Sequence, residues 1–387
     1  MRFLDYVSIN PKISLEKERI YPFVEMGDVS TSFRNPDKVE YKSFDSGVKF
    51  ADGDTVIARI TPCLQNGKRF YCKNIGQGFG STEYLVFRPK DSSVDNLYLY
   101  YFMNTDFIKE SMVRSMVGAT GRQRVNNDVF SRLDVTFPNI EIQRRIAEIL
   151  STYDDLIENN RKQNKLLEEA AQRLYKEWFV DLRFPGHENT KITDGVPEGW
   201  HKTTLAEIAA IIKRGISPKY ADDGKYTVIN QKCIRGSVMD ITESRKQEKQ
   251  YELTLNIQDC DTVICSTGTG TLGRVGQIYG DYPNTTFDSH VTLVRAKENP
   301  NFMYHVIKNQ QEFLMGMGRG STNQQELYRN VIENIEVLLP DRRLLLQTEK
   351  LLNTIHNKIE TVYSQTAILT EARDCMLPKL MSGEIEV

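Results

Sequence analysis

Two loops of this 387-residue sequence carry side chains of the types that read the edges of DNA bases. The first loop, GATGRQRVNN, runs from Gly118 to Asn127, and the second, GRGSTNQQEL, runs from Gly318 to Leu327. Arginine can bridge O6 and N7 of guanine, and glutamine or asparagine can bridge N6 and N7 of adenine. The candidates for base recognition are Arg122, Gln123, Arg124, Arg319, Thr322, Asn323 and Gln324.

Basic residues in other loops are better suited to holding phosphates, which position a protein on DNA without reading its sequence. They are Arg59, Lys68, Arg69, Lys213, Arg214, Lys219, Lys232, Arg235 and Arg274, with Thr269 in the glycine-rich loop beside Arg274. The net charge is −2 and the pI is near 6.3, so no global field attracts nucleic acid. Any DNA contact must come from local patches, because a basic residue taken singly is more often a solvated surface charge.

The glycine-rich stretch from Gly268 to Gly273 matches the G-x-G-x-x-G pattern of dinucleotide-binding loops. That chemistry needs a helix to open at the third glycine, so that the helix N-terminus meets the phosphates. The residues that follow, RVGQIYG, have the pattern of a strand, and the equivalent first-half stretch ITPCLQNGK lacks these glycines. We therefore predict a hairpin loop, and a nucleotide-binding enzyme is the weakest functional alternative.

No other pattern in the sequence indicates a catalytic centre or a metal site. The carboxylates of Asp37 and Glu40 lie too close along the chain to imitate a metal-dependent nuclease, whose ligands come from separate strands. The five histidines never fall at metal-ligand spacing, and the six cysteines include no C-x-x-C pair. We expect reduced thiols and a chain with no catalytic residue, metal or cofactor of its own.

The candidate loops belong to two halves that repeat each other. The stretch FPNIEIQRRIAEIL from Phe137 has a diverged copy, LLPDRRLLLQTEKLL from Leu338, and an offset of 202 residues aligns Pro138 with Pro340 and holds to the end. Upstream the offset drifts but the order of matching segments persists, as loops diverge faster than the elements they connect. We interpret the chain as a tandem duplication rather than chance similarity.

Each half begins with short runs typical of β-strands, which helical stretches interrupt. The strand-like runs are DTVIARI, RFYCKN, EYLVFRP and LDVTFP in the first half, and YTVINQK, DTVICS, VGQIYG, HVTLVRA and IEVLLP in the second. The helical stretches are LYLYYFMNTDFIKESMV and FMYHVIKNQQEFLMGM. The sequence therefore predicts an α+β fold with two globular domains, over residues 1–138 and 186–340.

A long helical segment follows each domain, over residues 139–185 and 341–387. The first has no proline or glycine from 139 to 178, and a helix of about 40 residues would span about 60 Å. In the second, Pro378 should bend the helix or end it early. Apolar residues recur in both with heptad spacing, and those expected to pack the helices are Ile146, Leu150, Ile157, Leu167, Leu352, Ile355, Ile359 and Leu369.

Two apolar stripes in one duplicated chain can bury each other. A pseudo-twofold relation would pair the helices antiparallel, with one globular domain at each end. Asn160 and Asn164 fall on seam positions, where a polar side chain costs stability and sets the register. The alternative is that each helix folds back on its own domain.

The composition is that of a globular cytosolic protein, with 40% hydrophobic and 26% charged residues. No apolar run reaches the roughly 18 residues that a membrane span needs. The first residues, MRFLDYVSIN, lack the pattern of a signal peptide. We expect a cytoplasmic protein without a membrane partner.

Three stretches of the chain resemble the specificity (S) subunits of type I restriction-modification systems. They are the junction Phe137-Pro138 with Gln143, Ile146, Ala147 and Leu150, the run KLLEEAAQRLYKEWF from Lys165 to Phe179, and PEGWHKTTLAEIA from Pro197 to Ala209. The likeness covers essentially the whole chain, including its duplication. The first half lacks the Pro-Glu-Gly-Trp start, and the second junction carries Gln347 two residues later than Gln143 predicts, which leaves the start of that helix open.

The resemblance implies two target recognition domains separated by two antiparallel helices, each domain reading one part of a split, asymmetric DNA sequence. It implies that the chain itself is not an enzyme. Two modification subunits would supply S-adenosylmethionine and the adenine methyltransferase site, and restriction subunits would supply ATP hydrolysis, with Mg²⁺, and cleavage. The alternatives are the specificity subunit of a related type II methylation system and a two-module protein–protein scaffold on a coiled-coil spacer.

Overall fold

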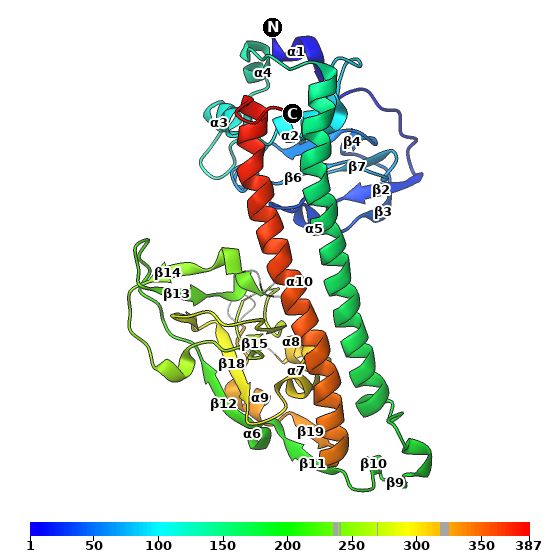
Figure 1. Cartoon of the computed structure of the whole chain (residues 1–387), viewed down its shortest axis with the longest axis vertical. Coiled ribbons are helices and arrows are strands. Elements are labelled where there is room, and N and C mark those ends of the chain that lie inside the picture. Colours follow the sequence, from blue (N-terminus) through cyan, green and yellow to red (C-terminus); the bar gives the residue numbers. More distant parts are fainter. Residues whose placement is uncertain (235–238, 240, 269, 318–324) are drawn as a thin grey trace. The chain divides into compact units, whose positions relative to one another are not determined.

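A computed structural model describes the chain except for residues 235–238, 240, 269 and 318–324 (Figure 1). The described residues form two compact units, which are treated separately below. Unit 1 contains Met1–Asn160 and Gln365–Val387, and unit 2 contains Arg161–Ser364. The predicted boundaries at residues 138, 185 and 340 divide the chain by sequence, whereas the compact units divide it by contacts, and each unit contains part of both long helices. The predicted boundaries therefore remain predictions.

Unit 1 contains two four-stranded sheets that share a core. The first, in the order β1-β8-β5-β6, is antiparallel and consists of β1 (Val7–Ile9), β5 (Thr55–Ala58), β6 (Arg69–Tyr71) and β8 (Tyr84–Pro89). The second, β3-β2-β7-β4, consists of β2 (Ile20–Val24), β3 (Glu40–Ser43), β4 (Val48–Phe50) and β7 (Gly78–Gly80), with β2 and β7 parallel. Val56 and Phe70 of the first sheet pack with Val24 and Phe50 of the second.

Unit 2 repeats this plan. Its antiparallel sheet, β12-β18-β15-β16, consists of β12 (Ala209–Arg214), β15 (Thr262–Cys265), β16 (Val275–Gln277) and β18 (Val291–Ala296). Its second sheet, β14-β13-β17, consists of β13 (Tyr226–Ile229), β14 (Arg245–Gln247) and β17 (Thr285–Phe287), with β13 and β17 parallel. Two-stranded pairs are formed by β9 (Ile192–Thr193) with β10 (Val196–Pro197), and by β11 (His201–Thr204) with β19 (Glu336–Leu339). The predicted α+β class is confirmed.

An identical buried ion pair marks the repeat in the two antiparallel sheets. In unit 1 the Arg88 guanidinium donates to both carboxylate oxygens of Asp54, at 2.6 and 2.7 Å. In unit 2 Arg295 binds Asp261 in the same way, at 2.8 and 2.7 Å. Both aspartates are buried immediately before the central strand of their sheet. Because a buried carboxylate is costly without such a partner, the pair fixes the same strand register in each copy.

Short helices lie around the sheets. They are α1 (Phe3–Tyr6), α2 (Asn96–Phe102), α3 (Asp106–Arg114) and α4 (Asp128–Arg132) in unit 1, and α6 (Leu205–Ile208), α7 (Pro300–Asn309), α8 (Gln311–Gly316) and α9 (Arg329–Glu333) in unit 2. Single 3₁₀ turns are η1 (Met26–Asp28), η3 (His187–Asn189), η4 (Gln231–Cys233), η5 (Ile241–Glu243) and η6 (Leu253–Leu255). Each predicted helical stretch is therefore two helices, α2 with α3 and α7 with α8.

One predicted strand, LDVTFP, is wrong. The equivalent second-half run forms β19, which pairs with β11 over four residues from His201↔Leu339 to Thr204↔Glu336. In the first half the corresponding contact is the single bridge Arg2↔Asp134. A strand-like pattern becomes a strand only where a partner backbone lies beside it.

The two long helices begin at equivalent positions. Helix α5 spans Ile140–Tyr175 and is followed by a π-helical turn, η2 (Lys176–Val180); helix α10 spans Arg342–Ser382. The offset of 202 residues aligns Ile140 with Arg342, so the displaced Gln347 does not move the start of the second helix. The expectation that Pro378 ends the helix early is wrong, because α10 continues through it for another turn to Ser382.

The helices pack antiparallel within each unit. In unit 1, Ile146 and Leu150 near the start of α5 share a core with Leu377 and Leu380 near the end of α10. In unit 2, Ala171 near the end of α5 shares a core with Leu352 near the start of α10. Of the predicted packing residues, Ile146, Leu150, Ile157, Leu352 and Ile359 are buried, whereas Leu167, Ile355 and Leu369 are half-buried. Tyr98, Tyr100 and Tyr101 of α2 belong to the same cluster as Ile146, so the start of α5 also packs on its own domain.

A polar side chain ties the start of each long helix to the globular domain before it. Gln143, 1% exposed, accepts from the backbone N of Asp95 at 2.9 Å and donates to the carbonyls of Ser93 and Pro138. In unit 2 the equivalent position is Leu345, and Gln347 is exposed. Glu349 takes over the task, since its carboxylate accepts from the backbone N atoms of Asn301 and Phe302 at the start of α7.

The ion pair between α5 and α10 in unit 1 provides a stability test. Arg373 donates to Asp154 at 2.6 Å, Tyr101 donates to the other Asp154 oxygen at 2.6 Å, and both charged groups are at most 5% exposed. Asp154→Asn removes the buried counter-charge of Arg373 and leaves the guanidinium with only the exposed Asp374, to which it donates at 2.8 and 2.9 Å. We expect unit 1 to lose about 3 kcal/mol of unfolding free energy in urea denaturation. Glu148→Gln, at an exposed position on the same helix, is the control. Equal midpoints for both variants would contradict the assignment.

Candidate nucleic-acid interface

The first candidate loop is anchored to the end of β5 in unit 1. The backbone N of Gln123 donates to Thr61 Oγ1 at 2.9 Å, and that of buried Val125 donates to the Arg59 carbonyl at 2.9 Å. Bridges join Arg124 to Ile60 and to Val117. These contacts leave Arg122 exposed at the tip of the loop and Gln123 half-buried.

Arg124 is engaged by an acidic neighbour. Its guanidinium donates to both carboxylate oxygens of Glu83 at 2.6 to 3.0 Å. These hydrogen bonds hold the pKa of Glu83 below its usual value, so the carboxylate is ionised at neutral pH. A DNA contact by Arg124 therefore competes with an existing, solvent-exposed ion pair.

Three other unit 1 candidates donate to backbone carbonyls. Arg59 reaches the Val125 carbonyl at 3.2 Å, Lys68 the Met26 carbonyl at 2.5 Å, and Arg69 the Gly67 carbonyl at 2.8 Å. All three side chains are half-buried. Their cationic groups thus support the loops around β5 and β6, and part of their hydrogen-bonding capacity is already used.

Unit 2 has a corresponding anchor with different chemistry. Thr267 bridges to Glu326, and the backbone N of Leu327 donates to the Ser266 carbonyl at 2.8 Å. Glu326 therefore stands where Arg124 stands in unit 1, and it pairs with the Arg214 guanidinium. The predicted Arg235, Thr269, Arg319, Thr322, Asn323 and Gln324 lie outside the described residues.

The remaining unit 2 candidates differ in whether an acidic side chain already pairs with them. Lys213 pairs with Glu252 at 2.7 Å, and Lys219 pairs with Glu248. Lys232 is exposed and Arg274 is half-buried. Of these, Lys232 lies at a feature that the sequence did not predict.

That feature is a cleft of about 350 Å³ at the end of the β14-β13-β17 sheet. Its lining residues are Tyr220, Asn230, Gln231, Lys232, Glu243, Ser244, Arg245 and Asp288. The Arg245 guanidinium lies 3.6 Å from the centre of the Tyr220 ring, and the Asn230 side chain accepts from the backbone N of Lys232 at 2.8 Å and donates to the Glu243 carbonyl at 3.0 Å. Sequence reasoning missed Tyr220, Asn230 and Arg245, because only strand pairing brings them together.

The glycine-rich loop has the predicted hairpin form and is not the start of a helix. β15 and β16 pair antiparallel on either side of it. Gly273 has φ +78, and a Cβ there would come within 2.5 Å of the backbone N of Met315 in α8. This glycine is therefore explained by close packing against α8 rather than by phosphate binding.

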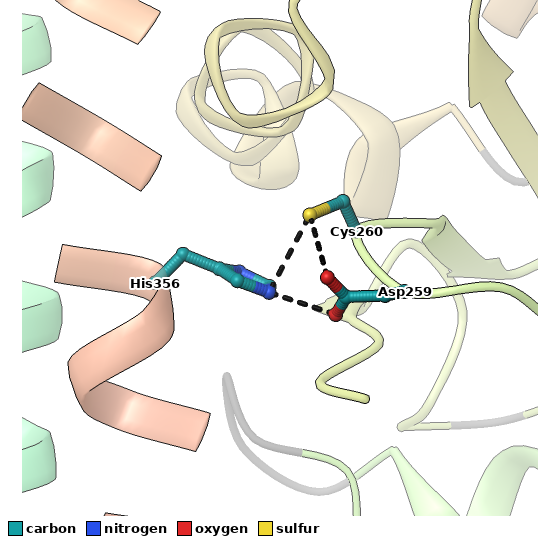
Figure 2. A group of neighbouring side chains, drawn as sticks. All are labelled: Asp259, Cys260 and His356. Atoms are coloured by element: carbon teal, nitrogen blue, oxygen red, sulfur yellow. Dashed lines mark hydrogen bonds and ion pairs between the residues drawn. The ribbon is translucent and has the colours of Figure 1, made fainter. Parts of the chain in front are cut away.

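A third group of polar residues joins α10 to the loop before β15 in unit 2 (Figure 2). Nε2 of His356 lies 2.9 Å from Asp259 Oδ1 and 3.4 Å from Cys260 Sγ, which lies 3.3 Å from Asp259 Oδ2. Burial raises the pKa of Asp259, but hydrogen bonds from His356 and from the backbone N of Gly280 outweigh it and hold the pKa at about 2. Burial and the Asp259 charge raise the pKa of the Cys260 thiol.

These three residue types also occur in catalytic triads, but the geometry differs. A triad uses one imidazole nitrogen as base toward the nucleophile and the other to bind the carboxylate. Here both the thiol and the carboxylate face Nε2, while Nδ1 is buried and has no partner among the described groups. Spacing along the sequence gave no indication of this cluster, since 96 residues separate Cys260 from His356.

Comparisons with known proteins agree with the duplicated architecture. The family model for the type I restriction modification DNA specificity domain matches twice, at residues 8–169 and 197–360. The MjaIX specificity subunit of Methanocaldococcus jannaschii is 25% identical over 77% of this chain and 71% of its own length. The HindI specificity subunit of Haemophilus influenzae is 23% identical over 94% of each chain. The crystal structure of the type I restriction-modification S subunit from M. genitalium has the same fold, with a TM-score of 0.57 and 18% identity over 98% of this chain and 95% of that one.

The fold and the loops define a duplicated α+β binding protein whose two domains carry different side chains on equivalent loops. Because the family model matches most of the chain in two copies, the chain belongs to the type I restriction-modification DNA specificity family. Among the residues that the structure describes, no helix is long and apolar enough to cross a membrane.

The ion pairs of Arg124 with Glu83 and of Arg214 with Glu326 can be tested by removing the acidic partner. Glu83→Gln should release Arg124, so we expect the purified chain to bind duplex DNA more tightly at low salt, with a slope of log K against log salt steeper by about 0.9 for one added phosphate contact. Glu326→Gln should act likewise on Arg214. The control is Glu110→Gln, which frees the exposed Arg114 of α3. A similar gain with the control would mean that net charge alone is responsible.

Proposed function

We propose that this chain is the sequence-specific DNA-binding subunit of a type I restriction-modification complex, and that it reads a split, asymmetric DNA target. The carrying observation is the presence of two DNA specificity domains in one chain. The two domains keep the buried Asp–Arg pairs and the sheet order but differ at their loops. Arg124 in one domain corresponds to Glu326 in the other, so the two domains present different side chains at this position, which supports two different half-sites.

The chain supplies recognition, and partner subunits supply chemistry. Two modification subunits would bring S-adenosylmethionine and the adenine methyltransferase site, and restriction subunits would bring ATP hydrolysis with Mg²⁺ and DNA cleavage. A methyltransferase that acts on a base in duplex DNA must flip that base out of the stack. The specificity subunit then needs only to hold each modification subunit over the correct base pair.

The target itself provides the main test. The chain, assembled with its modification subunits, is incubated with a random DNA library, and the methylated adenines are located by sequencing. We expect two short, dissimilar motifs at a constant separation, because each domain reads its own bases. A single contiguous motif, or methylation without sequence preference, would contradict the proposal.

Variants in the unit 2 cleft and in the unit 1 loop allow the reading of each half-site to be tested separately. Arg245→Ala removes the guanidinium stacked on Tyr220, and Arg122→Ala removes the exposed arginine of the unit 1 loop. Each variant should relax one half-site only, and loss of a base-edge contact should reduce methylation of the cognate sequence by roughly 5- to 150-fold, the equivalent of about 1–3 kcal/mol. Arg114→Ala, which removes an exposed arginine on α3, is the matched control. Relaxation of both half-sites by one variant would contradict independent reading.

Salt dependence distinguishes this proposal from a protein–protein scaffold. Binding through several phosphate contacts should weaken steeply between low and physiological salt, with a log–log slope of about −0.9 for each contact. The measurement is a titration of the assembled protein with cognate duplex at several salt concentrations. A flat profile would favour the scaffold.

A further inference from the structure

The His356–Asp259–Cys260 cluster has features of a metal-binding site. We propose that these three side chains bind one divalent transition-metal ion of the zinc class, with water completing a tetrahedral set. The proposal goes beyond DNA recognition and concerns unit 2 alone, where His356 comes from α10 and the other two residues from the loop before β15 (Figure 2).

The spacing of the three ligand atoms fits such an ion. Zinc lies about 2.3 Å from a cysteine sulfur and about 2.0–2.2 Å from imidazole nitrogen or carboxylate oxygen. In a tetrahedral set the sulfur therefore stands about 3.5–3.7 Å from the other ligand atoms, and the nitrogen and oxygen stand about 3.3–3.6 Å apart. The sulfur lies 3.4 Å from His356 Nε2 and 3.3 Å from Asp259 Oδ2. These two distances and the 2.9 Å between Nε2 and Oδ1 each need to lengthen by a few tenths of an ångström, and a single Asp259 oxygen would serve as the ligand.

The surrounding residues hold the ligands in place. Asp259 Oδ1 accepts from the backbone N of Gly280 at 2.8 Å, and the Cys260 backbone N donates to the Ile278 carbonyl at 3.1 Å. The His356 ring is stacked on Tyr279, with the ring centres 4.5 Å apart and 18° between their planes. A metal site depends on this kind of outer support, which orients the ligands before the ion arrives.

The second imidazole nitrogen provides an independent indication. His356 is 2% exposed, and its buried Nδ1 has no partner among the described groups. The residue lines a small cavity of about 10 Å³, which has room for about one water molecule. A histidine that binds a metal through Nε2 donates its Nδ1–H to a neighbouring polar group, and a water there would meet that need.

The fold does not require these residue types at this place. Because Asp54 and Asp261 are equivalent, Cys260 corresponds to Gly53, and His356 corresponds to Asp154 by the helix offset. In unit 1 that position pairs with Arg373 instead, so the same scaffold is held without a thiol or an imidazole. A thiol, an imidazole and a carboxylate together favour zinc over the hard cations Mg²⁺ and Ca²⁺.

Metal binding would replace the hydrogen bonds within the cluster. The Cys260 S–H bond breaks, its proton leaves to solvent, and the sulfur forms a bond to the ion. The proton that His356 Nε2 donates to Asp259 moves to Nδ1, so that Nε2 and the Asp259 carboxylate can each contribute a lone pair. One thiolate and one carboxylate then balance the 2+ charge. Asp259, with 37% of its side chain exposed, gives the ion access from solvent. The bound ion would clamp the unit 2 part of α10 to the loop before β15.

The test uses the full-length chain stripped of metal with a chelator. Titration with Co²⁺ should produce a thiolate-to-cobalt absorption band at one ion per chain, Zn²⁺ should abolish the band by displacement, and binding should release one proton and strengthen as the pH rises. Zn²⁺ should also raise the thermal midpoint of the wild type. Cys260→Ser should remove the band, and Asp259→Asn and His356→Gln should weaken zinc binding by at least about tenfold.

Matched controls separate the site from other thiols and imidazoles. Cys375→Ser and His201→Gln change exposed residues of the same types and should bind metal as the wild type does. Thermal midpoints in chelator identify any variant that is unfolded, and the wild-type titration stands independently of the variants. No cobalt band in the wild type would show that the cluster is only a hydrogen-bonded tether and would overturn the proposal. A band that persists in Cys260→Ser would overturn it as well.

Discussion

Burial of the apolar stripes of α5 and α10 is the constraint on which the rest of the structure depends. A helix of 36 or 41 residues with one apolar face is stable in water only when that face is covered. In unit 1 the cover is shared between the partner helix, through Leu377 and Leu380, and the tyrosines of α2. In unit 2 the π-helical turn η2, which follows α5, is covered by aromatic residues, with Phe179 contacting Trp200 and Phe302. The helices are thus bound to each other and to the globular domains by the same apolar residues.

The duplication preserves what supports the domains and varies what they present. The Asp54–Arg88 and Asp261–Arg295 pairs, the sheet order and the start of each helix are repeated. The bridge to the segment that follows β5 or β15 is repeated, but it carries Arg124 in one copy and Glu326 in the other. A scaffold whose buried pairs are retained can tolerate this change, because exposed charges contribute little to stability. Two dissimilar surfaces on one fold are what a protein needs to read two dissimilar sequences.

Where a long helix meets its globular domain, the two units use different polar side chains to hold the helix in place. Gln143 holds the start of α2, whereas Glu349 holds the start of α7 from a position farther along its helix. Asp154 binds Arg373 and Tyr101, whereas His356 faces Asp259 and Cys260. Each arrangement leaves its buried polar groups largely paired, as burial requires. The unpartnered Nδ1 of His356 is the exception that distinguishes the unit 2 cluster.

The sequence by itself determined the duplication, the α+β class, the strands within eight of its nine strand-like runs and both long helices, because these follow from local periodicity and from a constant offset between the halves. It missed the other strands of both units, among them β2, β7, β12 and β17. It also indicated the basic loops, although not which of their side chains are engaged by Glu83, Glu252 or a backbone carbonyl. Only the tertiary structure decided that LDVTFP lacks a strand partner, that Arg245 stacks on Tyr220 and that His356 meets Cys260. These outcomes depend on residues tens to about a hundred positions apart, and their proximity arises from strand pairing and helix packing that no local pattern encodes.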